Sequence, residues 1–188
     1  MTEVRERYTM PTMTEQFSTG GGLVAVGPGL ATWTEMRGKF DGDTLPYDVT
    51  LELVFDPAMN RMVASALTCT QREDGPPVTT EGIRRIPVRD LTRTLVAGNL
   101  IDVNRSGAVA ILSKEPGELT AAGPTDEALR AVAWVYRIAY LASDSPTAAV
   151  SQRFGLSRDT ASRWVAMARK RGFLGRAQRR KAGEVVEA

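Results

Sequence analysis

Histidine is absent from the 188-residue sequence, and cysteine occurs once, as Cys69. The lack of histidine excludes His-based catalytic triads, imidazole metal ligands and a histidine general base. A single cysteine excludes an intramolecular disulfide and a cysteine-rich zinc site. An enzyme built on this sequence would have to use carboxylate, lysine, tyrosine or serine chemistry.

Long hydrophobic runs are also lacking. The longest apolar stretch, over residues 131–142, contains Arg137 and is too short to span a bilayer. The N-terminus is polar and charged, which does not fit a secretory signal. Hydrophobic residues make up 43% of the chain, enough to bury a core. We therefore expect a soluble cytoplasmic protein, associated with the nucleoid if it binds DNA.

The net charge of +2 hides a division along the chain. Residues 1–124 carry a net charge of −4, whereas residues 125–188 carry +6. Between positions 145 and 182 there are ten basic residues and one acidic residue, Asp159. Such an asymmetry predicts an anionic partner for the basic part, with nucleic acid ahead of a membrane surface.

The first part of the chain predicts a tail followed by a small α+β unit over residues 30–120. Residues 1–29 are rich in Thr, Met and Gly, a composition that favours a flexible lead-in. Their glycines lack the spacing of a phosphate-binding loop. Alternating apolar residues predict a strand over 47–55 and a second over 61–70, with a third over 33–40. On the second strand, alternation places Val63, Ser65, Leu67 and Cys69 on one side.

Helical patterns follow in this unit, after the turn-rich segment 71–77. Thr79 or Thr80 is placed to cap a short helix, and a further helix is predicted over 88–96 after Pro87. Residues 99–120 are weakly patterned and predict a strand or a loop. The segment 121–124 (AAGP) marks the expected boundary of the unit.

Three features of this unit invite a functional interpretation, and each has a simpler one. The acidic cluster Asp41, Asp43 and Asp48 fails the calcium-loop pattern and favours a solvated turn over a metal site. The basic residues are consistent with phosphate contact but better with a solvated helix face; they are Arg84, Arg85, Arg89 and Arg93. Cys69 lies in a strand pattern, where a small core residue is expected rather than a nucleophile.

The C-terminal third predicts three helices. The first covers 125–143, and its wide apolar surface suggests packing on the preceding unit, or on a second subunit, as well as on its own domain. The second covers 147–154, with Ser145 as N-cap and Pro146 at the first helical position. The third covers 158–171.

Capping and packing residues delimit the third helix. Gly155 ends the second helix, Leu156 fills the turn, and Ser157 caps the third. Gly172 ends the third helix, and residues 173–174 are expected to fold back as an apolar clasp. The helical period puts two sets of residues on opposite faces. The inward set is Ala161, Trp164, Val165 and Ala168; the outward set is Asp159, Ser162, Arg163, Ala166 and Lys170, with Arg158 and Arg169 at the flanks.

Residues 147–166 resemble the helix-turn-helix family of DNA-binding proteins. The likeness rests on Gly155 in the turn and on a set of apolar positions, Val150, Phe154, Leu156 and Trp164. Small residues, Ser151 and Ala161, stand where two such helices would cross, although the family usually has Ala at the first position and a larger aliphatic residue at the second. The segment SRDTASRW is similar to recognition helices of actinobacterial and actinophage regulators.

The resemblance implies major-groove reading by the third helix, with its N-terminal residues against base edges. The candidate base contacts are Ser157, Arg158, Asp159, Ser162 and Arg163. The candidate phosphate contacts are Thr147, Arg169, Lys170, Arg171, Arg176, Arg179, Arg180 and Lys181, of which those after 174 lie in a polar tail expected to be disordered when free. Asp159 could accept a hydrogen bond from cytosine or orient Arg163 one turn on.

We therefore predict an α+β protein with a tri-helical, helix-turn-helix domain over 125–174. The expected function is sequence-specific binding of double-stranded DNA as a transcriptional regulator, such as a repressor, of a phage or mobile element. No enzymatic activity, cofactor or metal is expected. Useful specificity favours a homodimer on two half-sites, with the N-terminal unit serving dimerisation, ligand sensing or partner binding.

Two alternatives remain at this stage. One is a low-specificity DNA-binding adaptor whose N-terminal unit recruits RNA polymerase, a recombinase or a packaging enzyme. The other is an enzyme that acts on nucleic acid through a metal bound by the carboxylates of Asp41, Asp43 and Asp48.

Overall fold

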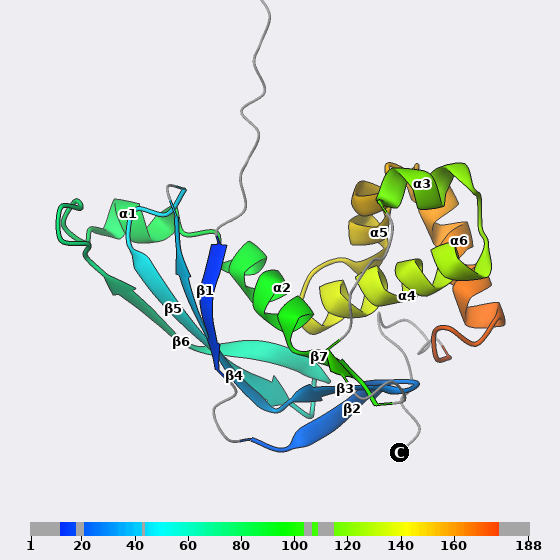
Figure 1. Cartoon of the computed structure of the whole chain (residues 1–188), viewed down its shortest axis with the longest axis horizontal. Helices are drawn as coiled ribbons and strands as arrows, with labels where there is room; N and C mark the ends of the chain where they lie inside the picture. Colours follow the sequence, from blue (N-terminus) through cyan, green and yellow to red (C-terminus); the bar gives the residue numbers. More distant parts are fainter. Residues whose placement is uncertain (1–11, 18–20, 43, 104–106, 109–114, 177–188) are drawn as a thin grey trace, which may run out of the picture.

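The computed structural model describes residues 12–17, 21–42, 44–103, 107–108 and 115–176. The fold is mixed α+β, with two antiparallel sheets and a group of helices (Figure 1). The larger sheet has the order β1-β4-β5-β6, with strands β1 (Thr12–Phe17), β4 (Glu35–Asp41), β5 (Asp48–Asp56) and β6 (Arg61–Thr70). The smaller has the order β2-β3-β7-β8, with strands β2 (Leu23–Gly27), β3 (Leu30–Trp33), β7 (Leu100–Asp102) and β8 (Gly107–Ala108).

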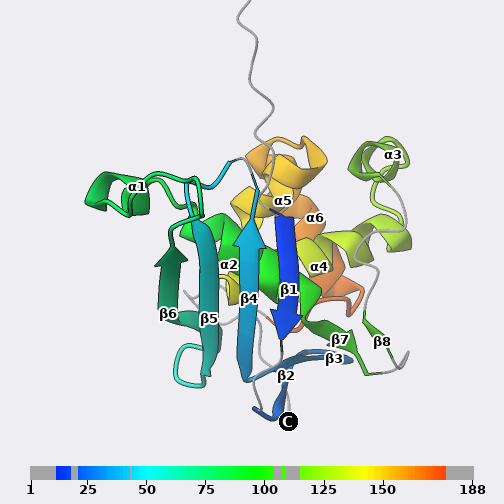
Figure 2. The ribbon, with the colours of Figure 1, turned by 60° about the vertical axis from the view of Figure 1, so that its left-hand side comes forward.

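The helices lie on one side of the larger sheet and beyond it (Figures 1 and 2). In chain order they are α1 (Thr80–Arg84), α2 (Val88–Gly98), α3 (Pro116–Ala121), α4 (Asp126–Leu141), α5 (Pro146–Phe154) and α6 (Arg158–Lys170). In the described part of the chain, none of them combines the length and the apolarity that crossing a membrane requires.

Alternation along β5 creates the inner face of the larger sheet. Val49, Leu51 and Leu53 are buried, and α2 covers them with Leu91 and Leu95. The predicted strands over 47–55 and 61–70 are confirmed to within one residue. The helix predicted over 88–96 is also confirmed, and it continues to residue 98.

A bulge in β6 corrects the predicted alternation of that strand. Glu52 of β5 is paired with Ala66 and Leu53 with Ala64, so Ser65 has no partner on β5. The extra residue changes which side chains face inward. Met62, before the bulge, is 1% exposed and shares the core with Leu67 and Cys69 after it. The prediction that Val63 and Ser65 share a side with Leu67 and Cys69 is therefore wrong.

The strand predicted over 33–40 is in fact parts of two strands in different sheets. The chain passes from β3 to β4 at Thr34, whose amide donates to the carbonyl of Gly22 and whose carbonyl accepts from the amide of Phe55. One residue thus bonds to both sheets, and apolar alternation alone does not reveal such a crossing.

Two segments that were expected to lack regular structure form strands or a helix. The flexible lead-in predicted for residues 1–29 is wrong for 12–17 and 23–27, which are strands β1 and β2. Pro116 and Gly117, in the segment predicted as a strand or a loop, lie in the first turn of α3, where proline is well tolerated. Leu119 of α3 packs into the helical core, so the expected boundary at 121–124 separates α3 from the residues it contacts.

Helix α4 is shared by two hydrophobic cores, which confirms the expectation that its wide apolar surface packs on the N-terminal unit. Ile138 and Leu141 belong to the core of the larger sheet, whereas Leu129 and Val132 belong to the core formed with α5 and α6. Thr125 caps the helix through a hydrogen bond from the Ala128 amide.

An ion pair reinforces this junction. Arg93 of α2 donates to Asp144, in the turn between α4 and α5, at 2.7 Å. The other carboxylate oxygen of Asp144 accepts from the Ser145 amide at 2.8 Å. The start of α5 is therefore tied directly to the helix that covers the sheet.

Candidate nucleic-acid interface

Helix α6 starts where the sequence predicts. Ser157 has extended backbone angles, and its hydroxyl accepts from the Thr160 amide at 3.2 Å. This bond satisfies one of the amides left free at a helix start. Asp159 lies in the first turn, where negative charge is favoured by the helix dipole. The chemistry of this cap fixes the position at which the exposed face of α6 begins.

The turn between α5 and α6 is closed by hydrogen bonds in both directions. Gly155 has φ 61°, a left-handed conformation that favours glycine. The Leu156 amide donates to the Ser151 carbonyl at 3.0 Å, and the Ser151 hydroxyl donates to the Leu156 carbonyl at 2.6 Å. Ser151, where the family usually has alanine, thus contributes a bond that alanine could not make.

One face of α6 is completely buried, as predicted. The residues of this face are Ala161, Trp164, Val165 and Ala168. Trp164 lies against Phe154 of α5, with ring centroids 6.4 Å apart. Ala161 is fully buried in the same core.

The C-terminal end of α6 folds back as predicted. Gly172 has φ 77°, and its amide donates to the Arg169 carbonyl. The Phe173 amide donates to the Ala168 carbonyl, the bond pattern of a Schellman end. Leu174 is 2% exposed, and buried Arg137 of α4 donates to the Phe173 carbonyl at 2.7 Å. These contacts hold α6 rigidly against α4.

The opposite face of α6 is exposed over its whole length. It carries Arg158, Asp159, Ser162, Arg163, Ala166 and Lys170, and Ser157 is exposed at its start. All five candidate base contacts therefore lie on this helix or its cap. Among the described residues Asp159 makes no ion pair with Arg163, so its carboxylate is not used to orient that arginine.

The candidate phosphate contacts fall into three groups. Lys170 and Arg176 are exposed, and Thr147 is half-buried in the first turn of α5. Arg169 and Arg171 are held by other parts of the chain. Arg179, Arg180 and Lys181 lie outside the described residues.

Arg169 and Arg171 make specific contacts to the region around α4. Arg169 donates to the Tyr136 hydroxyl at 2.9 Å, its guanidinium lies 5.1 Å from the centre of that ring, and it also bonds the Gly175 carbonyl. Arg171 forms an ion pair with Asp126 in the first turn of α4. Both arginines thus stabilise the packing of α6 on α4.

Sequence reasoning missed polar groups on α5. Ser145 makes no side-chain cap, Pro146 has no amide hydrogen, and within the described chain the amides of Thr147 and Ala148 have no hydrogen-bond acceptor. Arg153, exposed in the last turn of α5, was also missed, although it belongs to the basic stretch over 145–182. The free amides at the start of α5 could have been expected from Pro146, because a proline at the first helical position marks the turn whose amides lack partners within the helix.

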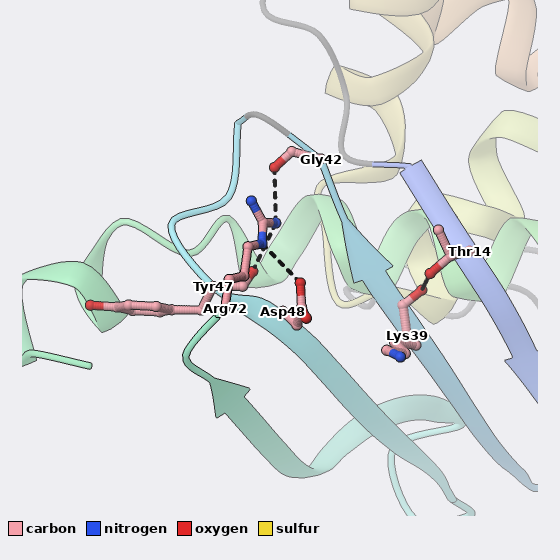
Figure 3. Close-up of polar contacts among 6 residues, drawn as sticks. All are labelled: Thr14, Lys39, Gly42, Tyr47, Asp48 and Arg72. Atoms are coloured by element: carbon pink, nitrogen blue, oxygen red, sulfur yellow. Dashed lines mark hydrogen bonds and ion pairs between the residues drawn. The ribbon is translucent and has the colours of Figure 1, made fainter. Parts of the chain in front are cut away.

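Asp48, one member of the acidic cluster of the N-terminal unit, makes a structural contact. Arg72 donates to Asp48 at 2.8 Å and to the carbonyls of Gly42 and Tyr47 at 3.1 and 3.4 Å (Figure 3). This guanidinium fastens the 42–48 connection to the end of β6. Asp43 lies outside the described residues. The part of the chain that the structure describes contains no group of Asp, Glu, Cys or His able to hold a metal ion.

The other candidates of this unit, the four arginines and Cys69, differ in their surroundings. Arg85 is paired with Glu81 at 3.4 Å and Arg93 with Asp144, whereas Arg84 and Arg89 are exposed. Burial raises the pKa of the Cys69 thiol above its usual value. A raised pKa lowers the thiolate fraction and disfavours a role as nucleophile.

A groove of about 610 Å³ lies between the β2–β3 hairpin and the chain that follows α6. Glycine and aliphatic residues form most of its lining, with Arg169 and Arg176 as the charged members. Its lining has no carboxylate and no hydroxyl, so it offers no acid–base pair.

Comparison of the chain with protein families, curated proteins and solved structures finds no match.

Proposed function

We propose that this chain binds double-stranded DNA and inserts α6 into the major groove, with α5 and α6 acting as a helix-turn-helix. The observation that carries the proposal is the division of α6 into a fully buried face and a fully exposed face that begins with arginine. A helix fixed in this way can present side chains to base edges without rearrangement.

Base recognition is assigned to the N-terminal half of the exposed face. Arg158 and Arg163 each offer two donors, which match the O6 and N7 acceptors of guanine. Asp159, free of an ion pair with Arg163, is suited to accept from the N4 amine of cytosine. Ala166, one turn beyond Arg163, is small and lets the helix approach the groove closely.

Phosphate contacts are assigned to groups that make no ion pair or hydrogen bond within the described chain. They include the free amides and hydroxyl at the start of α5, because a helix N-terminus favours an anion. Lys170 and Arg176 add positive charge, and Arg179, Arg180 and Lys181 remain candidates from the tail. Arg169 and Arg171 are reassigned to the packing of α6 on α4.

The biological role that fits this interface is a transcriptional regulator of a phage or mobile element, acting as a homodimer. One such helix reads only a few base pairs, and a dimer on two half-sites multiplies the specificity. We assign it no enzymatic activity and no cofactor.

Selection from a randomised duplex library tests the proposal. Purified protein should enrich one motif, and Arg163→Ala should lose about 1–3 kcal/mol on that motif and relax one base position. Arg89→Ala, which removes an exposed arginine from α2, is the matched control and should retain both affinity and motif. An unchanged motif with Arg163→Ala would refute the assigned orientation of α6. Enrichment without any motif would favour the low-specificity adaptor.

A further inference from the structure

Strand β6 forms one edge of the larger sheet, and no described strand pairs with its outer side (Figure 2). A free edge exposes a row of backbone donors and acceptors, and proteins commonly protect such an edge with charges, proline or a bulge. In β6 the only charge is Arg61, the first residue, there is no proline, and the one irregularity is the bulge at Ser65. By contrast, the central strand β4 carries Glu35, Arg37 and Lys39 on the open face of the same sheet.

The bulge makes β6 symmetrical about its midpoint. In a regular ten-residue strand, residues equally far from the midpoint point to opposite faces, because side chains alternate. In β6 the extra residue Ser65 reverses this relation. Met62 and Cys69 are equally far from the midpoint and both belong to the core. Ala64 and Leu67 are also equally far from it and lie on one side of the sheet, since they pair with Leu53 and Leu51 of β5, although Ala64 itself is exposed.

This symmetry fits a second copy of the strand. In an antiparallel pair, residues that lie opposite each other point to the same face. Two copies of β6 paired over 61–70 would set Met62 opposite the partner's Cys69 and Val63 opposite the partner's Thr68. Ser65 would lie opposite the partner's Ala66, and Ala66 opposite the partner's Ser65. Each bulge would therefore pair with the bulge of the other copy, and no residue would be left without a partner.

Exposed apolar residues lie at both ends of this edge. Met59, in the turn before β6, is 49% exposed, and Val78 and Ile83, in the segment after it, are 42% and 43% exposed. A two-fold axis at the middle of the strand brings each end of one copy toward the opposite end of the other. The same operation would cover apolar side chains at both ends of the interface.

We propose that the chain forms a homodimer through antiparallel pairing of β6 with β6 of a second copy. The paired strands join the two sheets into one, and the two-fold axis stands perpendicular to it. Both sets of helices then lie on the same side of the joined sheet. This proposal names the interface of the dimer in the proposed function, but it depends on the edge strand and not on DNA binding.

Like charges across the interface provide the test. Val63→Lys with Thr68→Lys in one chain sets lysine opposite lysine twice, and should weaken the dimer about tenfold or more. Val63→Glu with Thr68→Glu should do the same. Mixing the two variants should restore a dimer, since each lysine then faces a glutamate. Thr50→Lys with Val54→Lys, on the open face of β5, is the control that should leave the dimer intact.

Sedimentation velocity across micromolar concentrations gives the readout. The unmodified chain should sediment at twice the chain mass of 20.4 kDa. Amide hydrogen exchange of the unmodified chain is a second measurement, in which β6 should become more protected as concentration rises. Three results would overturn the proposal. They are a monomeric wild-type chain, a rate of amide exchange in β6 that does not change with protein concentration, and a lysine variant that remains dimeric. None of these outcomes depends on whether the chain binds DNA.

Discussion

At the scale of single residues, Gly82 and Tyr47 depend on each other. The Tyr47 ring is 1% exposed, and its hydroxyl accepts from the Thr79 amide and donates to the Pro77 carbonyl, both at 3.0 Å. A Cβ placed on Gly82 would come within 1.9 Å of that hydroxyl oxygen. Because both hydrogen bonds hold the ring in place, Tyr47 cannot withdraw without losing them.

We predict that Gly82→Ala destabilises the protein by about 1–3 kcal/mol, the usual cost of an overpacked core. Alanine is the better helix former, so propensity alone would give the opposite sign. Gly117→Ala is the control, since it adds the same methyl group to α3 with no atom within 4 Å. Urea unfolding should show a lower midpoint for the first variant and an equal or higher one for the second. Equal midpoints for Gly82→Ala and wild type would contradict the steric argument.

At the scale of elements, the turn between α5 and α6 sets the direction in which α6 leaves. Gly155 has a left-handed conformation, yet a Cβ there would meet no atom within 4 Å. The need for glycine is therefore a matter of backbone angles and not of space.

We predict that Gly155→Ala costs about 1–2 kcal/mol, because residues with a Cβ resist this conformation. Gly155→Asn should cost less, since asparagine adopts positive φ more readily than most residues. Thermal unfolding of the two variants checks the order. If asparagine proved as costly as alanine, crowding rather than backbone angle would be the cause.

The elements predicted well from sequence are those whose ends carry their own chemical signals. Helix α5 starts at a proline and ends at Gly155, whereas α6 starts after the Ser157 cap and is followed by Gly172. Each of these signals acts within a few residues. The bulge at Ser65 and the crossing at Thr34 arise from pairing with strands far along the chain. Local pattern carries no information on such pairing, and for that reason both were missed.

The candidate site divides in the same way. The exposed and buried faces of α6 follow from the helical period and were predicted residue by residue. The commitment of Arg169 to Tyr136 and of Arg171 to Asp126 was not, because these partners lie 33 and 45 positions away. A count of basic residues cannot distinguish arginines that are available to bind a ligand from arginines that are bonded to other residues of the fold.

At the scale of the whole molecule, α4 links the sheet and the helices into one structure. Its C-terminal part contributes Leu141, 1% exposed, to the core of the larger sheet. Its N-terminal part lies in the other core, which includes Trp164. Arg93 and Asp144 add a second connection between the two. The exposed face of α6 is therefore held at a fixed position relative to β6.

We predict that both cores unfold in a single transition, and that Leu141→Ala lowers the stability of both by about 2–5 kcal/mol, as cavity-forming substitutions do. In a background with Trp33→Phe and Trp134→Phe, fluorescence reports Trp164 in the helical core alone, whereas circular dichroism reports the whole chain. With Leu141→Ala, the two signals should move together to lower urea, although Leu141 lies in the other core. If the Trp164 transition stayed in place while the circular dichroism transition moved, the helices would be an independent unit. The helices would then be flexibly attached to the sheet, so that the distance between the two copies of α6 in a dimer would vary. The spacing between the two DNA half-sites would then be loosely defined.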